Sequence, residues 1–260
     1  MEVLVCVKRV PMVGGRIVLT ADGQDVDTRM AGFTISPHEE CAVEEAVQIT
    51  GRLGGAVSVL TLGSEASIDQ LRDCLSVGAG RAVLLETDGT EFGPIATADA
   101  IAGEVRLRAE TGPGYDLVLL GNEAADTGDY QIGVRLAHLL GWPVATGIKA
   151  IDVGDSGGHG AVVRARRQYR GADEVFELAL PAVVTVKEGI NLPRYPSLPG
   201  RLRAKRAQIE RRPVTWRPEG LRKQGLRVPA AARQQSTVLG TGVTAVPALV
   251  GVLAELGVLP

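Results

Sequence analysis

The sequence has few cysteines, few aromatic side chains and almost no net charge. Three cysteines, Cys6, Cys41 and Cys74, lie far apart among 260 residues and match neither a disulfide framework nor the spacing of zinc ligands. We therefore expect a reducing, cytoplasmic setting and no metal site. Aromatic residues make up 3% of the chain and the formal net charge is -2, which leaves little base stacking and no general attraction to phosphate backbones. Nucleic acid is thus excluded as the main partner.

Long hydrophobic runs are also missing. No stretch approaches the ~20 apolar residues of a membrane helix. The apolar start from Val3 to Val7 is too short for the core of a signal peptide, and Lys8 and Arg9 follow it directly. We expect a protein that is neither exported nor inserted in a membrane. The apolar fraction of 45% and the charged fraction of 22% are those of an ordinary globular protein.

What the sequence does have is an alternation of strand and helix patterns. Apolar, largely β-branched runs at 3–7, 56–62, 81–85 and 116–120 indicate strands that are buried on both faces. Between them, Ser36 as N-cap, Pro37 at the first helical position and Glu39 in a capping box mark one helix start. Further helices are predicted at 65–75, 95–108 and 131–140. Such alternation predicts an α/β fold with a doubly wound, mostly parallel sheet.

Other segments depart from this alternation. Residues 17–19 and 26–27, with a turn at Asp22 and Gly23, indicate a short hairpin. After Pro143 the strand-like stretches 148–153, 161–169 and 174–186 predict antiparallel additions to the sheet. Three prolines at every third position make 191–200 an extended, exposed loop. A polar linker at 213–237 and a final helix at 246–256 complete the prediction.

The fold predicts where a ligand would bind. In a sheet of order 3-2-1-4 the winding reverses between the first strand and the one ending at Leu120, so residues 6–10 would face residues 121–133. The second of these segments is a polar loop that leads into a helix N-terminus, whose free N–H groups suit phosphate. An equally good interpretation is that its polar residues only cap the helix. Neither loop carries a Walker or G-x-G-x-x-G motif, so hydride chemistry is not supported.

No residue is assigned to catalysis. Asp126 and Asp129 could form an acid/base pair, but adjacent loop carboxylates more often cap backbone N–H groups, and no nucleophile accompanies them. His138 and His159 lack the company that a metal or nucleophile site needs. The basic residues between Arg201 and Arg212 are interpreted as a solvated face that could also steer a partner.

Four pieces of the sequence carry a resemblance to a known family. They are Val3 to Val10, Ser36-Pro37 with Ala42 to Ala46, Leu119 to Pro143, and Leu180 to Thr185 continued through Pro193-Arg194-Tyr195 to Leu198-Pro199. With them the chain resembles the beta subunit of electron transfer flavoproteins. The resemblance implies an adenine-nucleotide alpha-hydrolase-like fold with an extended C-terminal arm, and an electron carrier rather than an enzyme.

The resemblance also implies cofactors and partners. A longer alpha subunit would complete a heterodimer around a shared FAD, and this subunit would hold AMP or, in bifurcating members, a second FAD. Electrons would come from flavin dehydrogenases, such as the acyl-CoA dehydrogenases of fatty acid beta-oxidation, and pass to a quinone-linked oxidoreductase. Leu198 matches the family's partner-docking leucine. The nucleotide positions carried over are Cys6, Ser36, Pro37, His38, Glu39, Leu62, Gly121, Asn122, Asp126, Thr127, Gly128, Asp129, Tyr130, Gln131 and Ile132.

The resemblance suggests three regions. Residues 1–190 would be the nucleotide-binding α/β domain, 191–212 the partner-recognition loop and basic segment, and 213–260 a linker and C-terminal arm that packs on the alpha subunit. The alternative is a stand-alone adenine-nucleotide-binding regulatory module of the universal-stress-protein type. The sequence lacks the glycine-rich phosphate signature of such modules, which argues against this alternative.

Several positions differ from the family pattern. Tyr130 and Ile132 flank Gln131 where relatives with AMP often have Asn-Gln-Thr, so a phosphate-binding hydroxyl is missing. His38 replaces a frequent phenylalanine, and no aromatic residue stands near Val13. Gln168 occupies a position that is often a glutamate linking the subunit to the flavin domain. Its neutral amide would weaken a hydrogen bond worth roughly 1.5 to 3 kcal/mol.

Overall fold

The fold is known from a computed structural model that describes residues 1–12, 14, 17–155, 161–218, 220, 223–229 and 237–259. The chain forms two units, Met1–Arg16 with Asp27–Lys223, and Ile17–Val26 with Gln224–Pro260. The predicted roles of Val13 and His159 fall on positions outside the described residues. The elements are β1 (Glu2–Cys6), β2 (Val10–Pro11), β3 (Phe33–Thr34), α1 (Pro37–Leu53), β4 (Ala56–Gly63), η1 (Glu65–Ser67), α2 (Ile68–Val77), β5 (Arg81–Glu86), α3 (Pro94–Thr111), β6 (Leu117–Gly121), α4 (Ile132–Leu140), β7 (Val144–Ile148), β8 (Ala150–Asp155), β9 (Ala161–Tyr169), β10 (Ala172–Ala179), β11 (Ala182–Val186), α5 (Leu198–Arg206), β12 (Glu210–Pro213), η2 (Gly242–Ala245) and α6 (Val246–Glu255).

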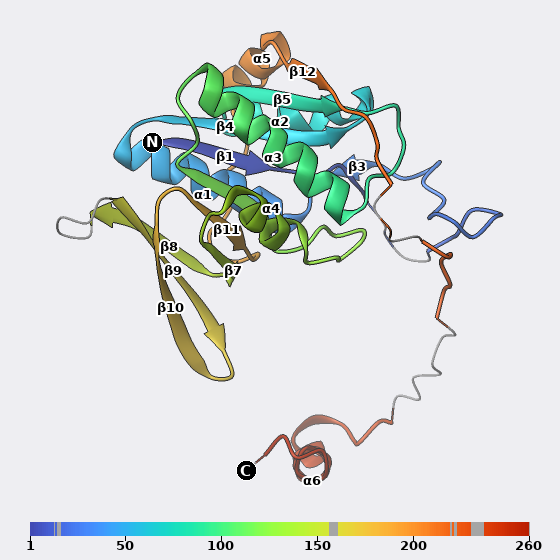
Figure 1. Ribbon diagram of the computed structural model, residues 1–260. Helices are drawn as coiled ribbons and strands as arrows, with labels where there is room; N and C mark the ends of the chain where they lie inside the picture. The colour runs from blue at the N-terminus through green and yellow to red at the C-terminus, as the bar shows by residue number, and fades with distance from the viewer. Residues whose placement is uncertain are drawn as a thin grey trace. The chain divides into compact units, whose positions relative to one another are not determined.

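A parallel sheet forms the centre of the first unit (Figure 1). Its strand order is β12-β5-β4-β1-β6-β11-β7, and every neighbouring pair is parallel. The first four strands of the alternation, β1, β4, β5 and β6, stand in the predicted order 3-2-1-4. The doubly wound α/β class predicted from the sequence is therefore confirmed, and the winding reverses between β1 and β6 as expected.

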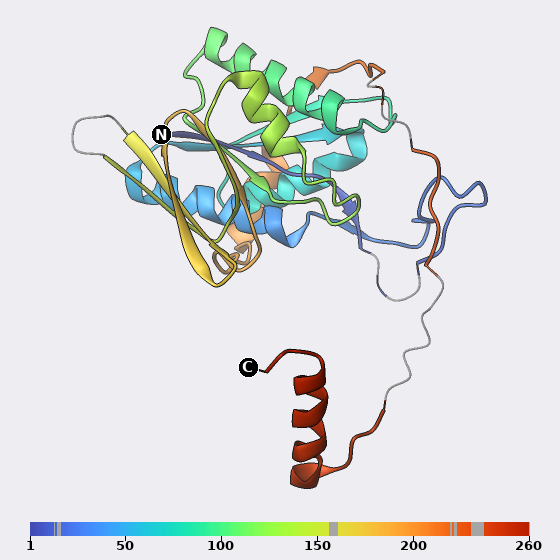
Figure 2. The same cartoon turned by 60° about the horizontal axis from the view of Figure 1, so that its bottom comes forward.

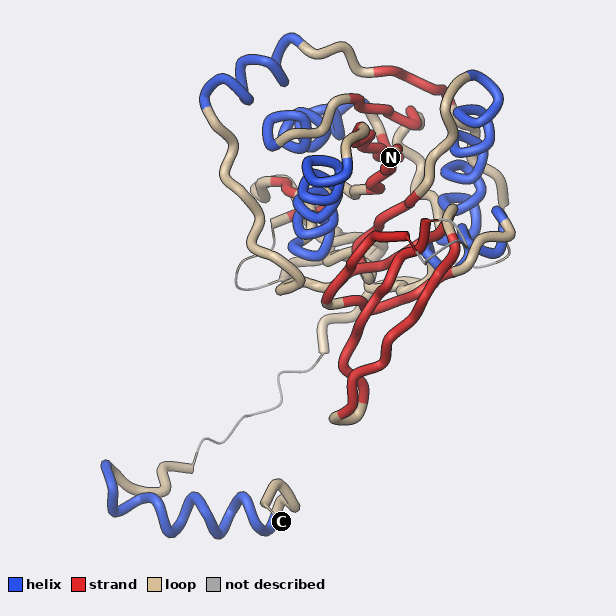
Figure 3. The backbone as a smooth tube through the Cα atoms, turned by 90° about the vertical axis from the view of Figure 1, so that its left-hand side faces the viewer, coloured by secondary structure: helices blue, strands red, loops and turns tan. Residues whose placement is uncertain are grey.

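Helices cover both faces of this sheet because each strand is apolar on both sides. Val3 and Val5 of β1 belong to the core beneath α1 and α2, whereas Leu4 and Cys6 belong to the core beneath α3 and α4. Figure 2 shows the green α3 and α4 on one side of the sheet and the blue α1 on the other, and Figure 3 shows strands between two groups of helices. The alternation of side chains along each strand thus fills two cores with one sheet.

The strand-like segments after Pro143 divide between two sheets, which corrects part of the prediction. β8, β9 and β10 form a separate antiparallel sheet, in which Val163 and Leu178 face the core and Arg164 faces outwards. In contrast, β7 and β11 join the central sheet as parallel strands. The predicted single strand over 174–186 is interrupted at Pro181, which has no N–H for a ladder. Residues 182–186, all buried, then run through the sheet interior.

Two further elements differ from the prediction. The loop expected to extend to Gly200 ends at Ser197, because Ser197 caps α5 and accepts a hydrogen bond from Gly200 N at 3.1 Å. The polar linker was expected to begin at residue 213, but Pro213 is still the last residue of β12, which pairs with β5 at the edge of the sheet. An edge strand tolerates a proline such as Pro213.

The second unit contains little regular structure. The predicted hairpin is reduced to one antiparallel bridge between Leu19 and Val26, and Leu226 N donates to Gly23 O at 2.7 Å. The final helix, α6, is present as predicted, and none of its residues is buried. Across the described ranges, no helix combines the length and the apolar character needed to cross a membrane.

Candidate functional site

The loops after β1 and β6 meet at one edge of the sheet. Cys6 and Leu120 are neighbours in the parallel register, so the chain leaves both strands at the same level. Lys8 Nζ then forms an ion pair with Asp126 Oδ2 at 2.7 Å and joins the two loops. The convergence predicted from the strand order is therefore confirmed. We call the place where these two loops meet the start of α1 the crevice, the usual name for this position in doubly wound sheets.

The N-terminus of α1 is fixed to both loops through Glu39. Its Oε2 accepts hydrogen bonds from Lys8 N at 2.9 Å and from Ser36 N at 3.4 Å. Gly121 lies so close that a Cβ there would stand 2.8 Å from Glu39 Cγ and 3.1 Å from His38 Cβ. Burial raises the pKa of Glu39 to about 8, although the two backbone N–H groups and Lys8 oppose this effect. At neutral pH the Glu39 carboxyl is therefore mainly protonated.

Two polar atoms at this helix start have no hydrogen-bond partner among the described residues. Ser36 Oγ and His38 Nδ1 are both buried and unpaired. The predicted capping box is present, because Glu39 Oε2 accepts from Ser36 N and the Ser36 side chain faces the backbone N–H of Glu39, although the Ser36 hydroxyl does not reach good hydrogen-bond geometry there. Buried polar groups are nearly always paired, so these two neighbouring atoms are available to a polar ligand.

Other predicted site residues are used by the structure itself. Asn122 Oδ1 accepts from Thr185 Oγ1 at 2.9 Å, and Asn122 N donates to Val186 O, which binds the loop to β11. Gln131 Oε1 accepts two hydrogen bonds from Arg135, at 2.8 and 3.0 Å. These contacts tie Asn122 to β11 and Gln131 to the side chain of Arg135, and the Gln131 side chain does not cap a backbone N–H of α4.

The tip of the β6–α4 loop is exposed and tightly turned. Gly128, at φ +58°, closes a turn by donating its N–H to Ala124 O at 3.0 Å. Tyr130 has a φ of 57°, unusual for a residue with a side chain, and is 59% exposed. Thr127 N donates to Asp126 Oδ1 at 2.8 Å. The loop therefore presents Asp129, Tyr130 and the following helix N-terminus at the crevice rim.

The remaining predicted residues lie on neighbouring elements. Cys6 ends β1, and burial raises the pKa of its thiol, which stays protonated. Leu62 lies near the end of β4, two residues beyond the register partner of Cys6. Lys8, Thr185 and Arg135 contact the predicted nucleotide positions. Lys8 lies in the 6–10 segment that the strand order placed opposite residues 121–133, whereas nothing in the local sequence of Thr185 or Arg135 indicates the contact.

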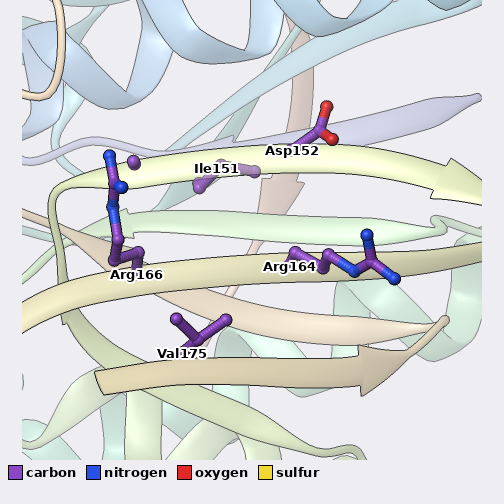
Figure 4. A pocket seen from close by; sticks show the side chains of 6 residues that line it. Ile151, Asp152, Arg164, Arg166 and Val175 are labelled. Carbon is purple, nitrogen blue, oxygen red and sulfur yellow. The ribbon is translucent and has the colours of Figure 1, made fainter. Parts of the chain in front are cut away.

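Other kinds of site find no support in the described part of the chain. There, no three His, Cys, Asp or Glu side chains gather as metal ligands. Cys6, Cys41 and Cys74 are buried and free. A shallow pocket on the antiparallel sheet is lined by Ala150, Ile151, Asp152, Arg164, Arg166 and Val175 (Figure 4). Two of its charges are already paired, Arg164 with Glu177 and Asp152 with Arg52, so it lacks the converging free groups of the crevice.

Comparison with known proteins agrees with the geometry. The model of the electron transfer flavoprotein domain matches residues 26–216. The electron transfer flavoprotein subunit beta of Bacillus subtilis is 35% identical over 182 residues, covering 69% of this chain and 67% of that protein. The corresponding subunit of Bradyrhizobium diazoefficiens is 33% identical, with 82% of each chain covered. The probable beta subunit of Saccharomyces cerevisiae is 33% identical and covers 81% of this chain and 79% of its own.

The chain belongs to the electron transfer flavoprotein family, among its beta subunits. Its role is electron transfer, and the family is one of flavin-dependent carriers. Nothing in these matches favours the stress-protein module. Within this family assignment, the departure at Gln168 falls on the outer face of β9, opposite Asp173 of β10, where the side chain is exposed.

The segment that resembles the family's recognition loop is strongly exposed. We call residues 191–206 the docking segment, after the role that the family resemblance predicts. Tyr195 is 93% and Leu198 72% exposed, and Leu198 is the first residue of α5. Pro193 and Pro196 precede it, and Pro199 is the second residue of the helix. An apolar side chain at a capped helix start, preceded by a proline-stiffened chain, loses little conformational freedom when it is buried by a partner.

Proposed function

We propose that this chain is the beta subunit of a heterodimeric electron transfer flavoprotein whose crevice holds an adenine nucleotide. The alpha subunit would provide most contacts to a shared FAD, which accepts and releases the electrons. The crevice would hold AMP or a second FAD. The observation that carries the nucleotide proposal is the pair of buried atoms Ser36 Oγ and His38 Nδ1, at the meeting point of two loops, which hydrogen-bond to no described residue.

The polar and apolar groups around the crevice are arranged as an adenylate would require. Cys6 and Leu62 provide apolar surface near the sheet, and Ser36 and His38 provide hydrogen-bonding atoms beside it. The α4 N-terminus offers the free N–H groups that phosphate requires. The raised pKa of Glu39 keeps one carboxyl of this acidic crevice largely neutral, which lowers the repulsion of a phosphate. The missing threonine at Ile132 would be replaced by backbone N–H groups.

The C-terminal arm supports the proposal of an alpha subunit. Helix α6 contains only one charged residue, Glu255, and buries none of its side chains. A helix that is apolar around most of its circumference requires cover from another surface. We assign residues 213–260 to a linker and an arm that packs on the alpha subunit, and residues 1–190 to the nucleotide-binding domain.

The docking segment supports the proposal of redox partners. We assign Leu198 to the binding of flavin dehydrogenases such as acyl-CoA dehydrogenases, with electrons passing on to a quinone-linked acceptor. Tyr195 lies three residues before it and is also exposed. Aromatic and aliphatic anchors held outward in this way suit a pocket on a partner protein.

The test is to identify the nucleotide bound by the co-expressed heterodimer. Acid release followed by chromatography should yield FAD together with AMP, or FAD alone at two equivalents. Ser36→Ala should lower the content of the beta-subunit nucleotide, and Leu198→Ala should slow reduction by an acyl-CoA dehydrogenase without loss of flavin. A chain that purifies alone, with no affinity for an alpha subunit and no nucleotide, would contradict the proposal.

A further inference from the structure

Two buried carboxylates of α1 take no part in the crevice. Glu44 and Glu45 are 5% and 8% exposed, and they follow Glu39 by more than one helical turn. Buried carboxylates destabilise a fold unless they are paired and fully hydrogen-bonded. The hydrogen-bond partners of Glu44 and Glu45 therefore indicate the structural role of the two carboxylates.

Both carboxylates bind the beginning of the docking segment. Glu44 Oε2 accepts from Arg194 Nε at 2.7 Å and from Arg194 N at 3.2 Å, while Glu44 Oε1 accepts from Arg194 Nη2 at 2.9 Å. Glu45 Oε2 accepts from Asn191 Nδ2 at 2.9 Å, and the same amide donates to Cys41 O at 3.0 Å. We call Glu44 and Glu45 with Arg194 and Asn191 the α1 clamp.

The bidentate pair is the strongest part of the clamp. Burial pushes the pKa of Glu44 upwards, but the hydrogen bonds from Arg194 and Gln48 outweigh it and hold the pKa below its ordinary value. The carboxylate is thus charged at neutral pH and binds a guanidinium in the parallel, two-bond geometry that restricts orientation most.

The other end of the docking segment is fixed to α2. A Cβ at Gly200 would collide with the carbonyl oxygen of Ser76, so the glycine permits close packing of α5 on α2. Arg72 Nη1 donates to Ala204 O and Lys205 O, both at 2.7 Å. The span between the two attachments, from Tyr195 to Pro199, contains the exposed anchors Tyr195 and Leu198.

We propose that Glu44 and Glu45 are positioning residues for partner docking, because the α1 clamp holds the docking segment in the shape that a partner dehydrogenase binds. This inference rests on the proposed docking role of Leu198. The clamp itself contacts no partner. It acts by removing conformations of residues 191–197 before the encounter, which lowers the entropy lost on binding.

The experiment uses the intact heterodimer with Glu44→Gln, a change that keeps size but weakens the bonds to Arg194. An acyl-CoA dehydrogenase charged with its acyl-CoA substrate reduces the heterodimer, whose concentration is varied. We expect KM for the heterodimer to rise by roughly tenfold with kcat unchanged, the loss typical of charge-assisted hydrogen bonds. Hydrogen–deuterium exchange of residues 191–197 should become faster in the absence of any dehydrogenase. Flavin and nucleotide content should stay as in the wild type.

Further variants make the result specific. Glu45→Gln should raise KM by a smaller factor than Glu44→Gln. Arg194→Lys keeps the positive charge but loses the two-bond geometry of the guanidinium, and its KM should lie between those of the wild type and Glu44→Gln. Glu177→Gln breaks an exposed Arg–Glu pair on the antiparallel sheet, away from the docking segment, and should leave KM unchanged. Unchanged KM in both glutamate variants, with a raised KM in Leu198→Ala, would overturn the clamp and spare the docking role. Unchanged KM in Leu198→Ala would instead overturn the docking role and the clamp with it.

Discussion

The two parts of helix α1 treat buried polar groups in opposite ways. At its start, Ser36 Oγ and His38 Nδ1 are buried without a partner. One to two turns later, the carboxylates of Glu44 and Glu45 are buried with hydrogen bonds from Arg194, Gln48 and Asn191. The difference separates two uses of polarity. In this helix the satisfied carboxylates fix the chain to itself, and the two unsatisfied atoms at its start stay available to a ligand.

The largest expected effect is a pH dependence of the free energy of unfolding that comes from Glu39 at the start of α1. The pKa of Glu39 is about 8 in the folded state, above its unfolded value, so the folded protein holds a proton that the unfolded chain releases. The stabilisation is complete below about pH 4.5 and is lost as the pH rises to about 8. We expect the free energy of unfolding to fall across this window by several kcal/mol, and Glu39→Gln to remove this component of the slope. Urea unfolding between pH 5 and 8 measures it, with the exposed Glu110→Gln as control.

The next largest effect is expected when the ion pair between Glu44 and Arg194 is broken. Arg194→Ala leaves the buried carboxylate of Glu44 with only Gln48 as a side-chain partner. We expect the free energy of unfolding to fall by about 3 kcal/mol, the cost of an uncompensated buried charge. Guanidinium unfolding of Arg194→Ala and of Glu44→Leu/Arg194→Leu tests this, because removing both partners should cost less than removing the arginine. Equal losses in the two variants would contradict it.

A smaller effect concerns the contact between α1 and the β6–α4 loop. Gly121→Ala places a methyl group 2.8 Å from Glu39 Cγ and 3.1 Å from Glu123 O. The helix start must shift, and we expect a loss of about 2 kcal/mol together with a lower nucleotide content. Gly103→Ala, on α3 with no heavy atom within 4 Å of the new Cβ, should not destabilise the protein. Thermal unfolding and nucleotide analysis distinguish the two.

The smallest effect on stability is expected at Ser36. An N-cap serine changed to alanine usually costs about 1 kcal/mol. Because the Ser36 side chain completes the capping box without a hydrogen bond of good geometry, Ser36→Ala should change the stability of the nucleotide-free chain by less than about 0.5 kcal/mol. The nucleotide-bound heterodimer should lose considerably more. A loss of about 1 kcal/mol in the nucleotide-free chain would show that the Ser36 hydroxyl stabilises the N-terminus of α1.

The sequence predicted those features that local patterns determine. The buried runs and their helices established the sheet order, and the order established which loops meet at the crevice. The same patterns did not distinguish β11 from β10, because membership in a parallel or antiparallel sheet is decided by distant partners. Glu210–Pro213 carries no strand pattern at all. Its place depends on Arg81, whose guanidinium binds Glu210 at 2.6 and 2.8 Å and also reaches the buried Glu104.

The same limit applies to the site. The positions Ser36 and His38 followed from the helix start and the family resemblance, but their lack of partners could only be seen in three dimensions. The side-chain oxygens of Asn122 and Gln131, two further predicted ligand groups, accept hydrogen bonds from Thr185 and Arg135, which the sequence did not indicate. Separating such residues requires knowledge of contacts made across the sheet, which spacing along the chain does not contain.

Strand β12 also protects the sheet from unwanted association. Without it, β5, whose central residues are wholly apolar and buried, would form the outermost strand and expose unpaired N–H and C=O groups. The strand that covers them is charged and ends in a proline, Glu210-Arg211-Arg212-Pro213, a composition that discourages another chain from extending the sheet. Since residues 191–206 lie in the connection between β11 and this covering strand, a deletion of the proposed docking segment would also risk baring the edge of β5.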